Sequence, residues 1–498
     1  MQEEYILAYD FGTTAVKAVL VNLKGQVLCS FTRDYPLIQL HPGWAEQDPE
    51  VLWQAVCTST KGVMEKSEIS ASNIKGIVFA APWKNIIPID KDGNILRNSI
   101  IWMDGRANEQ ASRLNEKAGF FVGTGQEYWP RLMWVKENEP EIWSKAEVIM
   151  GINTFLKWKA TGEIATDPSD DFFHAFNPRI QEYYDKVIAA AGLDADREKF
   201  PKAKLSTEKV GGTTEKAALE MGLRPGIPVF GGFGDLSAIT VGTGCCRTGD
   251  VHIYFGTSSW LISLIPERMP DFAPLYSIFD PNHDCAIFAL QTGCFAFDWA
   301  LNQFYRAERD ILKEEIFEYV DKQINSIEAG SMNMVATHWL NGELPPLAAK
   351  NAKAVFFNVT SSHDRRHMVR AIMESVCYTH RQYKEKYEAF TGKKLDSIRV
   401  VGGGAVSDVW MQILADILQL RVCIPENPRN TGAMGAYYCA MIGLGYLENY
   451  DAIYDTVKIS KVFNPNKENA ETYNKLYNIY SNLYPSLSNL YNEINGTY

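Results

Sequence analysis

The distribution of apolar residues along the chain predicts an alternation of strands and helices. Between residues 5 and 32, three apolar runs are separated by a Gly-Thr-Thr turn at 12–14 and a Lys-Gly turn at 24–25, which predicts an antiparallel meander. Residues 49–67 then place apolar side chains at helical spacing behind Asp48 and the proline that follows it, as expected at the start of a helix. Strand and helix patterns continue to alternate up to the middle of the chain, as they do in α/β folds.

The pattern of the first hairpin returns in the middle of the chain. Two segments, ILAYDFGTTAVKAVLV at 6–21 and HIYFGTSSWLISLI at 252–265, each place Phe-Gly-Thr and a second hydroxyl residue between two apolar strands. Only the first segment carries an acid before the turn, because Asp10 is replaced by Tyr254, which we expect to be a packing residue. Each hairpin opens one half of the chain, so the repeat predicts that a whole domain is duplicated.

The second half ends in three recognisable helical patterns. Residues 364–390 have the spacing of a long helix, and residues 397–418 combine an apolar strand, three consecutive glycines and a helix capped by Ser407 or Asp408. A closing helix is predicted by an apolar face formed by Tyr473, Leu476, Tyr477, Tyr480, Leu483 and Tyr484. Such an aromatic stripe is typical of packing rather than of a ligand site.

The length of the chain requires more than one domain. A chain of 498 residues exceeds what one hydrophobic core supports, so two or three domains are expected. The second hairpin places a boundary near 246–250. We therefore expect an N-terminal domain over 1–248, a C-terminal domain over 249–445, and a helical segment over 446–498 that packs on the body of the protein.

Composition and charge exclude several classes of protein. A hydrophobic share of 46% and a charged share of 22% are ordinary for a globular protein. With 49 basic and 60 acidic residues the net charge is -11, which disfavours binding to nucleic acid. The nine cysteines are scattered without a CxxC pair, so we expect neither a disulfide framework nor a zinc site. The N-terminus does not resemble a signal peptide and no run of eighteen apolar residues occurs, so we expect a cytoplasmic protein without membrane contact.

The two repeated turns have the composition of phosphate-binding loops. Glycine lets an anion approach the main chain, and neighbouring amides and hydroxyls can donate hydrogen bonds to it. Two such turns facing each other across a cleft would hold the phosphates of one nucleotide. Asp10, next to the first turn, could hold Mg²⁺ directly or through water, or it could simply stabilise the turn.

A second acid, Asp235, follows an apolar strand and a run of glycines in GIPVFGGFGDLSAITVGTG. A carboxylate at the C-terminal end of a strand lies where α/β proteins form ligand sites, and it could accept the proton of a hydroxyl that attacks a γ-phosphate. The alternative is that Asp235 only caps the following helix. The triple glycine at 402–404 lacks the G-x-G-x-x-G spacing of a dinucleotide fingerprint, but it suits an adenine or ribose lying on the backbone.

In order along the chain, these segments resemble the FGGY family of carbohydrate kinases, and among them its xylulokinase-like branch. The matching segments span nearly the whole chain and include YDFGTTAVKAVL, HPGWAEQDPEVLW, NSIIWMDGRA, RLMWVKENEPEIW, TGEIATDPSD, GGFGDLSAITVGTG, YFGTSSW, VRAIMESVCYTHR, VVGGGAVSDVWMQILAD and NTGAMGAYYCA. The resemblance implies an α/β fold of two actin-like (ribonuclease H-like) ATPase domains with a cleft between them. It also implies an ATP-dependent, Mg²⁺-dependent sugar kinase.

The resemblance assigns roles to individual residues. Mg²⁺ falls on Asp10 and the general base on Asp235. The ATP phosphates and the adenosine fall on a set of turn residues, namely Gly12, Thr13, Thr14, Gly256, Thr257, Ser258, Gly293, Gly402, Gly403, Gly404 and Ala405.

The loop that binds the sugar in the family is different in this chain. Relatives carry Gln-x-His-Gly or Gln-Met-Gln-Gly, whereas this chain has PWKN at 82–85. Lys84 could pair with a carboxylate or phosphate on the substrate, or it could extend into solvent. Trp83 could stack on a sugar face or fill an apolar gap.

The function expected from the sequence is therefore a kinase for a small sugar, with a pentulose such as D-xylulose as acceptor. A kinase for another ketose, polyol or sugar acid is the first alternative. A catalytically weak sugar-sensing or interaction protein on the same fold is the second. We expect ATP and a small sugar as partners, allow for a homodimer, and expect neither nucleic acid nor a membrane.

Overall fold

The computed structural model describes residues 3–170, 180–267, 269, 279, 284–344 and 347–496, and the chain divides into two compact units. The first unit contains Met1–Arg247, Pro266–Cys285 and Asn430–Thr456, and the second contains Thr248–Ile265, Ala286–Arg429 and Val457–Tyr498. Neither unit is one contiguous range. The units therefore differ from the three successive ranges expected from the sequence, although the first division, at residues 247 and 248, lies where the second hairpin begins.

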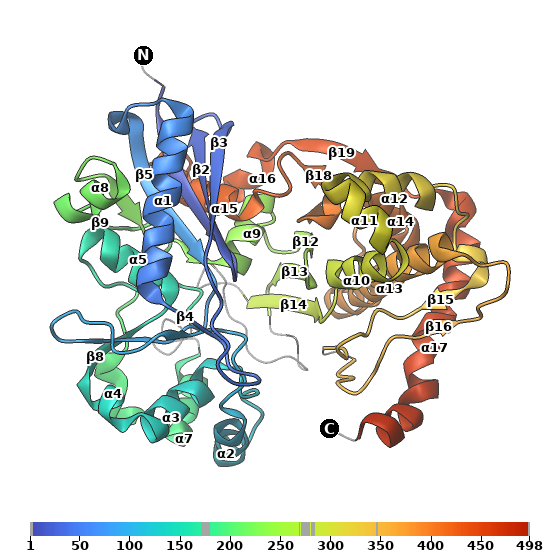
Figure 1. Cartoon of the computed structure of the whole chain (residues 1–498), viewed down its shortest axis with the longest axis horizontal. Coiled ribbons are helices and arrows are strands. Elements are labelled where there is room, and N and C mark those ends of the chain that lie inside the picture. The colour runs from blue at the N-terminus through green and yellow to red at the C-terminus, as the bar shows by residue number, and fades with distance from the viewer. Residues whose placement is uncertain are drawn as a thin grey trace. The chain divides into compact units, whose positions relative to one another are not determined.

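The first unit is built on a mixed sheet whose strands β1, β2 and β3 form the predicted antiparallel meander. Strands β1 and β5 are parallel and almost completely buried, in agreement with their unbroken apolar sequences. The order in the sheet is β3 (Val27–Asp34), β2 (Ala15–Asn22), β1 (Tyr5–Phe11), β5 (Ile74–Ala81), β10 (Pro228–Phe230) and β9 (Lys209–Gly212), with β11 (Phe233–Gly234) also pairing with β5. Figure 1 labels β2, β3, β5 and β9 of this sheet.

Helices pack against this sheet because alternate strand residues carry apolar side chains to both faces. Leu7 and Tyr9 of β1 belong to a core shared with α1 (Pro49–Ser67), α5 (Ile152–Thr161) and α8 (Glu215–Met221). Helix α1 begins after Asp48, whose side chain accepts a hydrogen bond from the Glu50 amide, as predicted. Helices α9 (Asp235–Thr243) and α15 (Thr431–Gly443) also pack on β5, and α15 contacts β1 and β2.

A helical lobe extends the first unit. Its core is aromatic and centres on Tyr128, Trp129 and Tyr184. The lobe contains α2 (Asn108–Ala118), α3 (Tyr128–Asn138), α4 (Pro140–Lys145) and α7 (Gln181–Ala191), and the strand pairs β6 (Ile87–Asp90) with β8 (Ala146–Met150) and β4 (Glu46–Gln47) with β7 (Ser99–Ile100) lie between the lobe and the sheet (Figure 1).

The second sheet repeats the strand order of the first. Its order is β14 (Asp284–Leu290), β13 (Ser259–Ile265), β12 (Val251–Phe255), β17 (Ser397–Val401), β18 (Arg421–Pro425) and β19 (Ile459–Phe463). In both sheets an antiparallel hairpin is followed by parallel strands and then by an antiparallel edge strand. The domain duplication predicted from the two hairpins is confirmed at the level of strand order.

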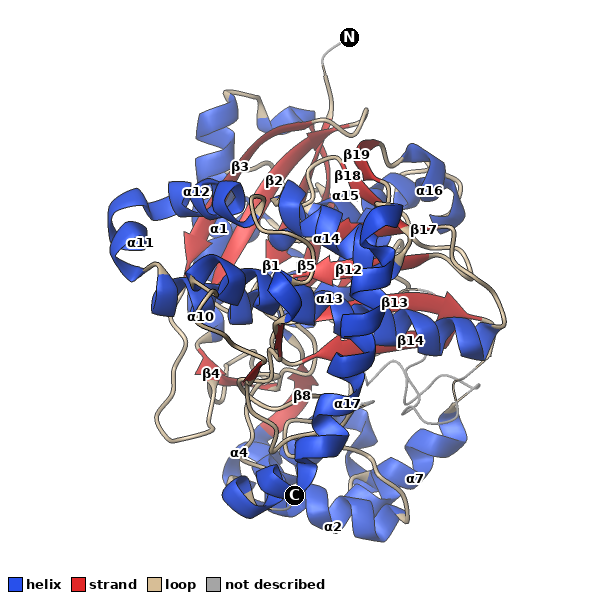
Figure 2. Ribbon diagram, turned by 90° about the vertical axis from the view of Figure 1, so that its right-hand side faces the viewer, coloured by secondary structure: helices blue, strands red, loops and turns tan. Residues whose placement is uncertain are grey.

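The helices of the second unit agree with their sequence patterns. Helix α13 (Arg365–Thr391) begins at the cap residue Asp364 and lies against α14 (Asp408–Leu418), whose cap is Ser407 (Figure 2). The closing helix α17 (Ala470–Asn495) contacts both, and most of its predicted apolar face is buried. The unit also contains α10 (Cys294–Phe304), α11 (Arg306–Leu312) and α12 (Ile316–Ile324). In the described part of the chain, no helix has the length and apolar character required to span a membrane.

Two helices that are distant in sequence cross closely inside the first unit. A side chain at Gly435 of α15 would overlap the carbonyl oxygen of Ala238 in α9, and one at Gly242 of α9 would overlap that of Thr431. The two glycines therefore allow the helix backbones to touch. This close packing explains why residues 430–456 belong to the first unit although they follow the strands of the second sheet in sequence.

We predict that Gly435→Ala lowers the free energy of unfolding by about 3 kcal/mol, because overpacking outweighs the roughly 1 kcal/mol that alanine gains in helix propensity. Urea denaturation measures this loss. Gly105→Ala is the matched control, since a methyl group there would have its nearest neighbour at 3.8 Å. Equal unfolding midpoints for the two variants would contradict the close helix crossing.

Candidate active site

Two acidic residues lie at the same edge of the first sheet. Asp10 of β1 is paired with Ala80 of β5, while Phe233 and Gly234 of β11 are paired with Ala80 and Ala81 from the other side. Asp235 follows Gly234 directly. The carboxylates of Asp10 and Asp235 therefore flank the C-terminal end of β5, the edge at which α/β sheets form ligand sites.

The surroundings of Asp235 favour proton transfer at neutral pH. Burial, with a smaller contribution from the nearby charge of Asp10, raises the pKa of Asp235 to about 6, although the backbone amide of Leu236 opposes this shift by donating to Oδ1 at 2.8 Å. A carboxylate with a pKa near the working pH is suited to act as a general base. Gly234 occupies the cap position of α9 and Asp235 is its first residue, so the helix-cap hypothesis for Asp235 is wrong.

Asp10 is held beside the start of α15. A Cβ at Gly432 would lie 2.7 Å from the Asp10 carboxylate oxygens, so only a glycine allows the acid to approach the helix backbone this closely. The N-terminus of a helix favours negative charge. Burial raises the pKa of Asp10, and Lys17, its partner on β2, lowers it. Lys17 also donates to Asn430, the residue that precedes α15, at 3.2 Å.

The carboxylates of Asp10 and Asp235 fit a weakly held Mg²⁺ rather than a dedicated metal cage. The described residues contain no group of three or more His, Cys, Asp and Glu side chains positioned to hold a metal ion. Mg²⁺ usually keeps several waters and uses one or two carboxylates together with substrate phosphates. Two desolvated acids at one edge, one of them raising the pKa of the other, match that donor set.

A buried polar network supports the glycine turn that carries Asp235. The ammonium of Lys157 donates to the Gly231 carbonyl at 2.7 Å and lies 3.8 Å from Asp167. Ser169 donates to Asp167 and accepts from the Gly234 amide at 2.6 Å. Lys157, Asp167 and Ser169 are all buried, and the opposite charges of Lys157 and Asp167 compensate each other. Their hydrogen bonds to Gly231 and Gly234 hold the turn before Asp235 in place.

Several backbone groups of the first hairpin turn already form hydrogen bonds within the first unit. The Gly12 amide donates to Ala15 O at 2.9 Å, and the Gly12 carbonyl accepts from the Tyr35 hydroxyl. Gln47 donates to Thr13 O at 2.6 Å, and Thr14 O accepts from the Tyr35 amide at 2.9 Å. The turn is thus rigid, with Gly12 and Thr14 exposed.

In the second unit, the structure brings the three predicted nucleotide-binding turns together. The amides of Gly293 and Phe295 donate to Thr257 O at 2.9 and 3.2 Å, and the Cys294 amide donates to Gly256 O at 2.8 Å. Gly402 has a φ of 101°, and a side chain there would overlap Phe255 O. The turn at 402–405 therefore lies directly against the hairpin tip at 255–258.

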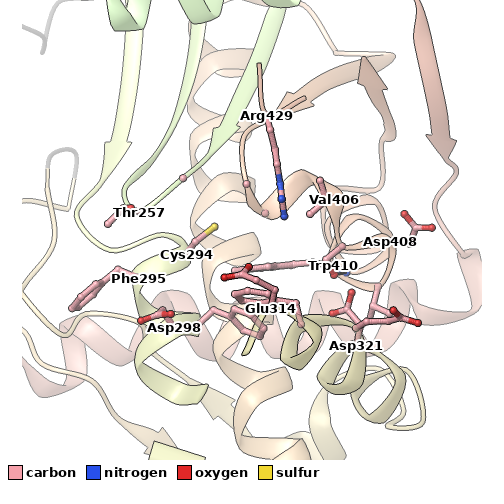
Figure 3. Close-up of a pocket in the computed structure, with 18 of the residues that line it drawn as sticks. Thr257, Cys294, Phe295, Asp298, Glu314, Asp321, Val406, Asp408, Trp410 and Arg429 are labelled. Carbon is pink, nitrogen blue, oxygen red and sulfur yellow. Dashed lines mark hydrogen bonds between the residues drawn. The ribbon is translucent and has the colours of Figure 1, made fainter. Parts of the chain in front are cut away.

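A pocket of about 1070 Å³ opens beside these turns. Gly256, Thr257, Gly403 and Gly404 line it, whereas Ser258, Gly293, Gly402 and Ala405 are not among its lining residues. Arg429 points into the pocket, and Glu314 and Asp321 stand on the opposite side (Figure 3). Phe297, Phe317 and Trp410 provide aromatic surface.

One wall of this pocket comes from α12 and the 3-10 turn Lys313–Glu315 before it, and it was not predicted from the sequence. Glu314 lies in the turn, and Phe317 and Asp321 lie in the amphipathic helix. The segment carries no motif, so no local signal distinguishes it from an ordinary surface helix. Burial, with a smaller contribution from the charge of Asp408, raises the pKa of Asp321 to about 6, while a hydrogen bond from Ser407 lowers it.

Trp83 and Lys84 leave the end of β5 between the two acids. A Cβ at Gly234 would lie 3.6 Å from Trp83 Cβ, so the loop adjoins the turn that carries Asp235. The Lys84 ammonium forms an ion pair with Glu127 and lies 5.0 Å from the centre of the Trp83 ring. The hypothesis that Lys84 extends into solvent is therefore wrong. Glu127 is a further residue that sequence analysis missed.

Comparison with known sequences identifies two family domains in the chain. Residues 5–242 match the N-terminal domain of the FGGY family of carbohydrate kinases, and residues 253–444 match its C-terminal domain. The chain is 28% identical over 489 residues to a xylulose kinase of Bacillus subtilis, with 96% of each chain covered. It is 26% identical to a gluconokinase of Bacillus licheniformis (96% of this chain, 94% of the relative) and 28% identical to a glycerol kinase of Thermococcus gammatolerans (95% and 96%).

Solved structures agree with the fold over nearly the whole chain. Gluconate kinase from Lactobacillus acidophilus superposes with a TM-score of 0.85 at 24% identity and covers 99% of this chain and 100% of its own. Xylulose kinase from Rhodospirillum rubrum gives a TM-score of 0.80 at 25% identity, with 98% and 100% covered. The two-domain, actin-like α/β fold expected from the sequence is confirmed.

We predict that Asp235→Asn stabilises the ligand-free protein at pH 8 by roughly 1 to 3 kcal/mol, because the raised pKa means that ionised Asp235 is disfavoured in the folded state. The gain should shrink as the pH falls through about 6 and should vanish below the pKa of an unfolded aspartate. Thermal unfolding between pH 4.5 and 8 measures it. A variant that is less stable than the wild type at pH 8 would contradict the desolvation of Asp235.

Proposed function

Because the chain belongs to the FGGY family of carbohydrate kinases and is a sugar kinase, we propose that it transfers the γ-phosphate of ATP to a hydroxyl of a pentulose such as D-xylulose. The observation that carries this proposal is the pair of carboxylates, Asp10 and Asp235, at the end of β5 beside Trp83. The use of ATP follows from the family. The choice of a pentulose is supported by the name of the Bacillus subtilis relative.

We assign the proton transfer to Asp235. As the acceptor hydroxyl oxygen attacks the γ-phosphorus, its proton passes to the Asp235 carboxylate, the bond to the β-phosphate oxygen breaks, and ADP leaves. The raised pKa makes Asp235 a stronger base than an exposed aspartate, and the network of Lys157, Asp167 and Ser169 keeps its turn in place. Trp83, beside this turn, offers an apolar face to the carbon skeleton of the sugar.

We assign the nucleotide to the pocket of the second unit. Gly256, Gly403 and Gly404 line this pocket, and the absence of a side chain at each lets phosphates approach the backbone. Arg429 supplies a positive charge. The aromatic wall formed by Phe297, Phe317 and Trp410 suits a purine. These turns are stabilised by four residues that do not line the pocket, namely Ser258, Gly293, Gly402 and Ala405. The corresponding turn of the first unit consists of Gly12, Thr13 and Thr14.

Asp10, assisted by Asp235, would hold Mg²⁺ when the nucleotide is present. The ion would neutralise charge on the phosphates during transfer. The two carboxylates, half-buried and with raised pKa values, would in turn be stabilised in their ionised forms by a nearby cation.

Of the two alternative functions, one keeps specific support. A kinase for another ketose, a polyol or a sugar acid is supported by the gluconokinase and glycerol kinase relatives and by the unusual PWKN loop. A catalytically weak sugar-sensing or interaction protein is disfavoured, because Asp10, Asp235 and the pocket turns are all present. The homodimer and the cytoplasmic location stay predictions from the sequence.

The acceptor is identified by measuring ADP release with a panel of pentuloses, hexuloses, polyols and sugar acids. We expect D-xylulose to give the highest kcat/KM. A higher value for another acceptor would replace the pentulose by that class. Silence with every acceptor, together with retained ATP binding, would favour the sensing function.

Asp235→Ala and Asp235→Asn should reduce kcat at least 1000-fold while leaving the Kd for ATP within about twofold, because the base is lost and the nucleotide pocket is untouched. In the wild type, kcat/KM for the sugar should rise with pH as Asp235 becomes ionised, with a midpoint at or below about 6, because the pKa of about 6 belongs to the ligand-free protein and a bound cation would lower it. Steady-state kinetics and calorimetry test both statements. Near-normal turnover in Asp235→Asn would refute the assignment.

A further inference from the structure

Residues 291–293 connect β14 to α10 and lie on the tip of the second hairpin. A side chain at Gly293 would come within 2.8 Å of Ser259 Cβ and 2.9 Å of Gly256 O, so the two backbones touch. The Gly293 amide also donates to Thr257 O at 2.9 Å. A displacement of about 1 Å would take this donor out of hydrogen-bonding range. The position of residues 291–293 therefore decides whether the hairpin tip keeps its shape.

A buried carboxylate holds the beginning of this connection. Glu343 is 3% exposed, and its Oε1 accepts from the backbone amides of Gln291 and Leu344, both at 2.9 Å. Its other oxygen, Oε2, lies 2.8 Å from Nε2 of His338, whose side chain is completely buried. The Thr292 hydroxyl donates to the His338 carbonyl. The two residues before the cap of α10 are thus bound to Glu343 and His338.

The segment that carries Glu343 is anchored in the core of the second unit. His338 Nδ1 lies 3.1 Å from the hydroxyl of Ser375, a buried residue of α13. Gly342 has a φ of 80°, and a side chain there would overlap Lys350 O. A tight glycine turn therefore sets the direction in which the chain enters Glu343. The carboxylate of Glu343 comes from a fixed position.

The connection that Glu343 holds borders the candidate nucleotide pocket. Cys294 and Phe295, which follow it directly, line the pocket on the same side as Thr257 (Figure 3). Glu343 itself is not among the lining residues. Any effect of Glu343 on a ligand in this pocket is therefore transmitted through the backbone of residues 291–293.

We propose that Glu343 is a positioning residue for the nucleotide. By accepting from the Gln291 amide, it keeps Gly293 on the hairpin tip at 255–258 and so maintains the shape in which the tip holds phosphates. Hydrogen bonds to an ionised acceptor are stronger than those to a neutral one, and removing the acceptor leaves the backbone donor without its partner. The inference rests on the proposed nucleotide site and adds to it a residue outside the pocket.

The first measurement is hydrogen exchange of the full-length, ligand-free protein. In Glu343→Ala, the amides of residues 291–295 should exchange about tenfold faster than in the wild type, because the connection loses its anchor. Glu343→Gln keeps an oxygen that can accept from the Gln291 amide, so it should restore most of the protection. Unchanged exchange of residues 291–295 in Glu343→Ala would overturn the proposal.

The second measurement is ATP affinity, by calorimetry and by steady-state kinetics with D-xylulose. Glu343→Ala should raise both the Kd and the KM for ATP about tenfold, and Glu343→Gln should lie between this variant and the wild type. The KM for the sugar should stay unchanged, because the candidate acceptor site belongs to the first unit. An unchanged Kd for ATP in Glu343→Ala, despite faster exchange, would refute the positioning role.

Glu388→Ala is the matched control, because it removes another buried carboxylate of the second unit. Glu388 is 4% exposed, accepts from the Leu395 amide at 3.0 Å and pairs with Lys394. Neither Glu388 nor Leu395 lines the pocket. The control should therefore leave the exchange of residues 291–295 and the Kd for ATP unchanged. Equal effects of Glu388→Ala and Glu343→Ala on both would indicate general damage and contradict the proposal.

Two further outcomes are decided by the same measurements. If Glu343→Ala does not fold, Glu343→Asp replaces it: this variant keeps the charge, but its side chain is one methylene shorter and withdraws from the Gln291 amide, so the same changes are expected. If the wild type binds no ATP, the nucleotide assignment fails. Hydrogen exchange then still decides whether Glu343 holds the turn: faster exchange in the variant supports this, and unchanged exchange overturns it.

Discussion

The burial of two neighbouring carboxylates, Asp10 and Asp235, is the constraint around which this edge of the first sheet is organised. Two half-buried carboxylates flank the end of one strand, and each needs compensation if the fold is to keep both. Lys17 and the N-terminus of α15 stabilise the negative charge of Asp10. The Leu236 amide at the start of α9 stabilises that of Asp235 by donating a hydrogen bond to it. The close crossing of α9 and α15 thus keeps two helix N-termini near two acids. The compensation is incomplete, as the raised pKa values of both acids indicate.

The two duplicated hairpins share a backbone arrangement but carry different side chains before the turn. In the first sheet the last residues of β1 include an acid that faces α15. At the corresponding position of β12, Tyr254 stacks on Trp260 at 4.2 Å, and its ring occupies the space that a side chain at Gly256 would need. The second hairpin therefore exchanges a charge for an aromatic surface that lines the pocket of the second unit. Tyr254 is both a packing residue, as predicted, and part of that pocket.

The features of the fold that depend on short stretches of sequence could be predicted. The meander, the Asp48 cap, the long helix α13 and the buried face of α17 follow from periodicity and capping, and the hairpin repeat revealed the duplicated strand order. The sequence also drew attention to Asp10 and Asp235, because each ends a strand pattern. It could not predict the ion pair between Lys84 and Glu127, since these residues lie 43 positions apart on different elements. Nor could it show that α15 packs on the first sheet, which depends on the glycine contacts between α9 and α15.

The return of α15 to the first unit has a consequence for how the protein is made. Residues 430–456 leave the ribosome after most of the chain has been synthesised, yet they cover β1 and β5 and complete the surroundings of Asp10. During synthesis, the apolar face of the first sheet that α15 covers stays exposed until residues 430–456 have been made. Contacts of such long sequence separation slow folding and expose surface that promotes aggregation. The N-terminal half therefore cannot fold completely by itself, and a chain interrupted before residue 430 would lack the helix that lies against Asp10.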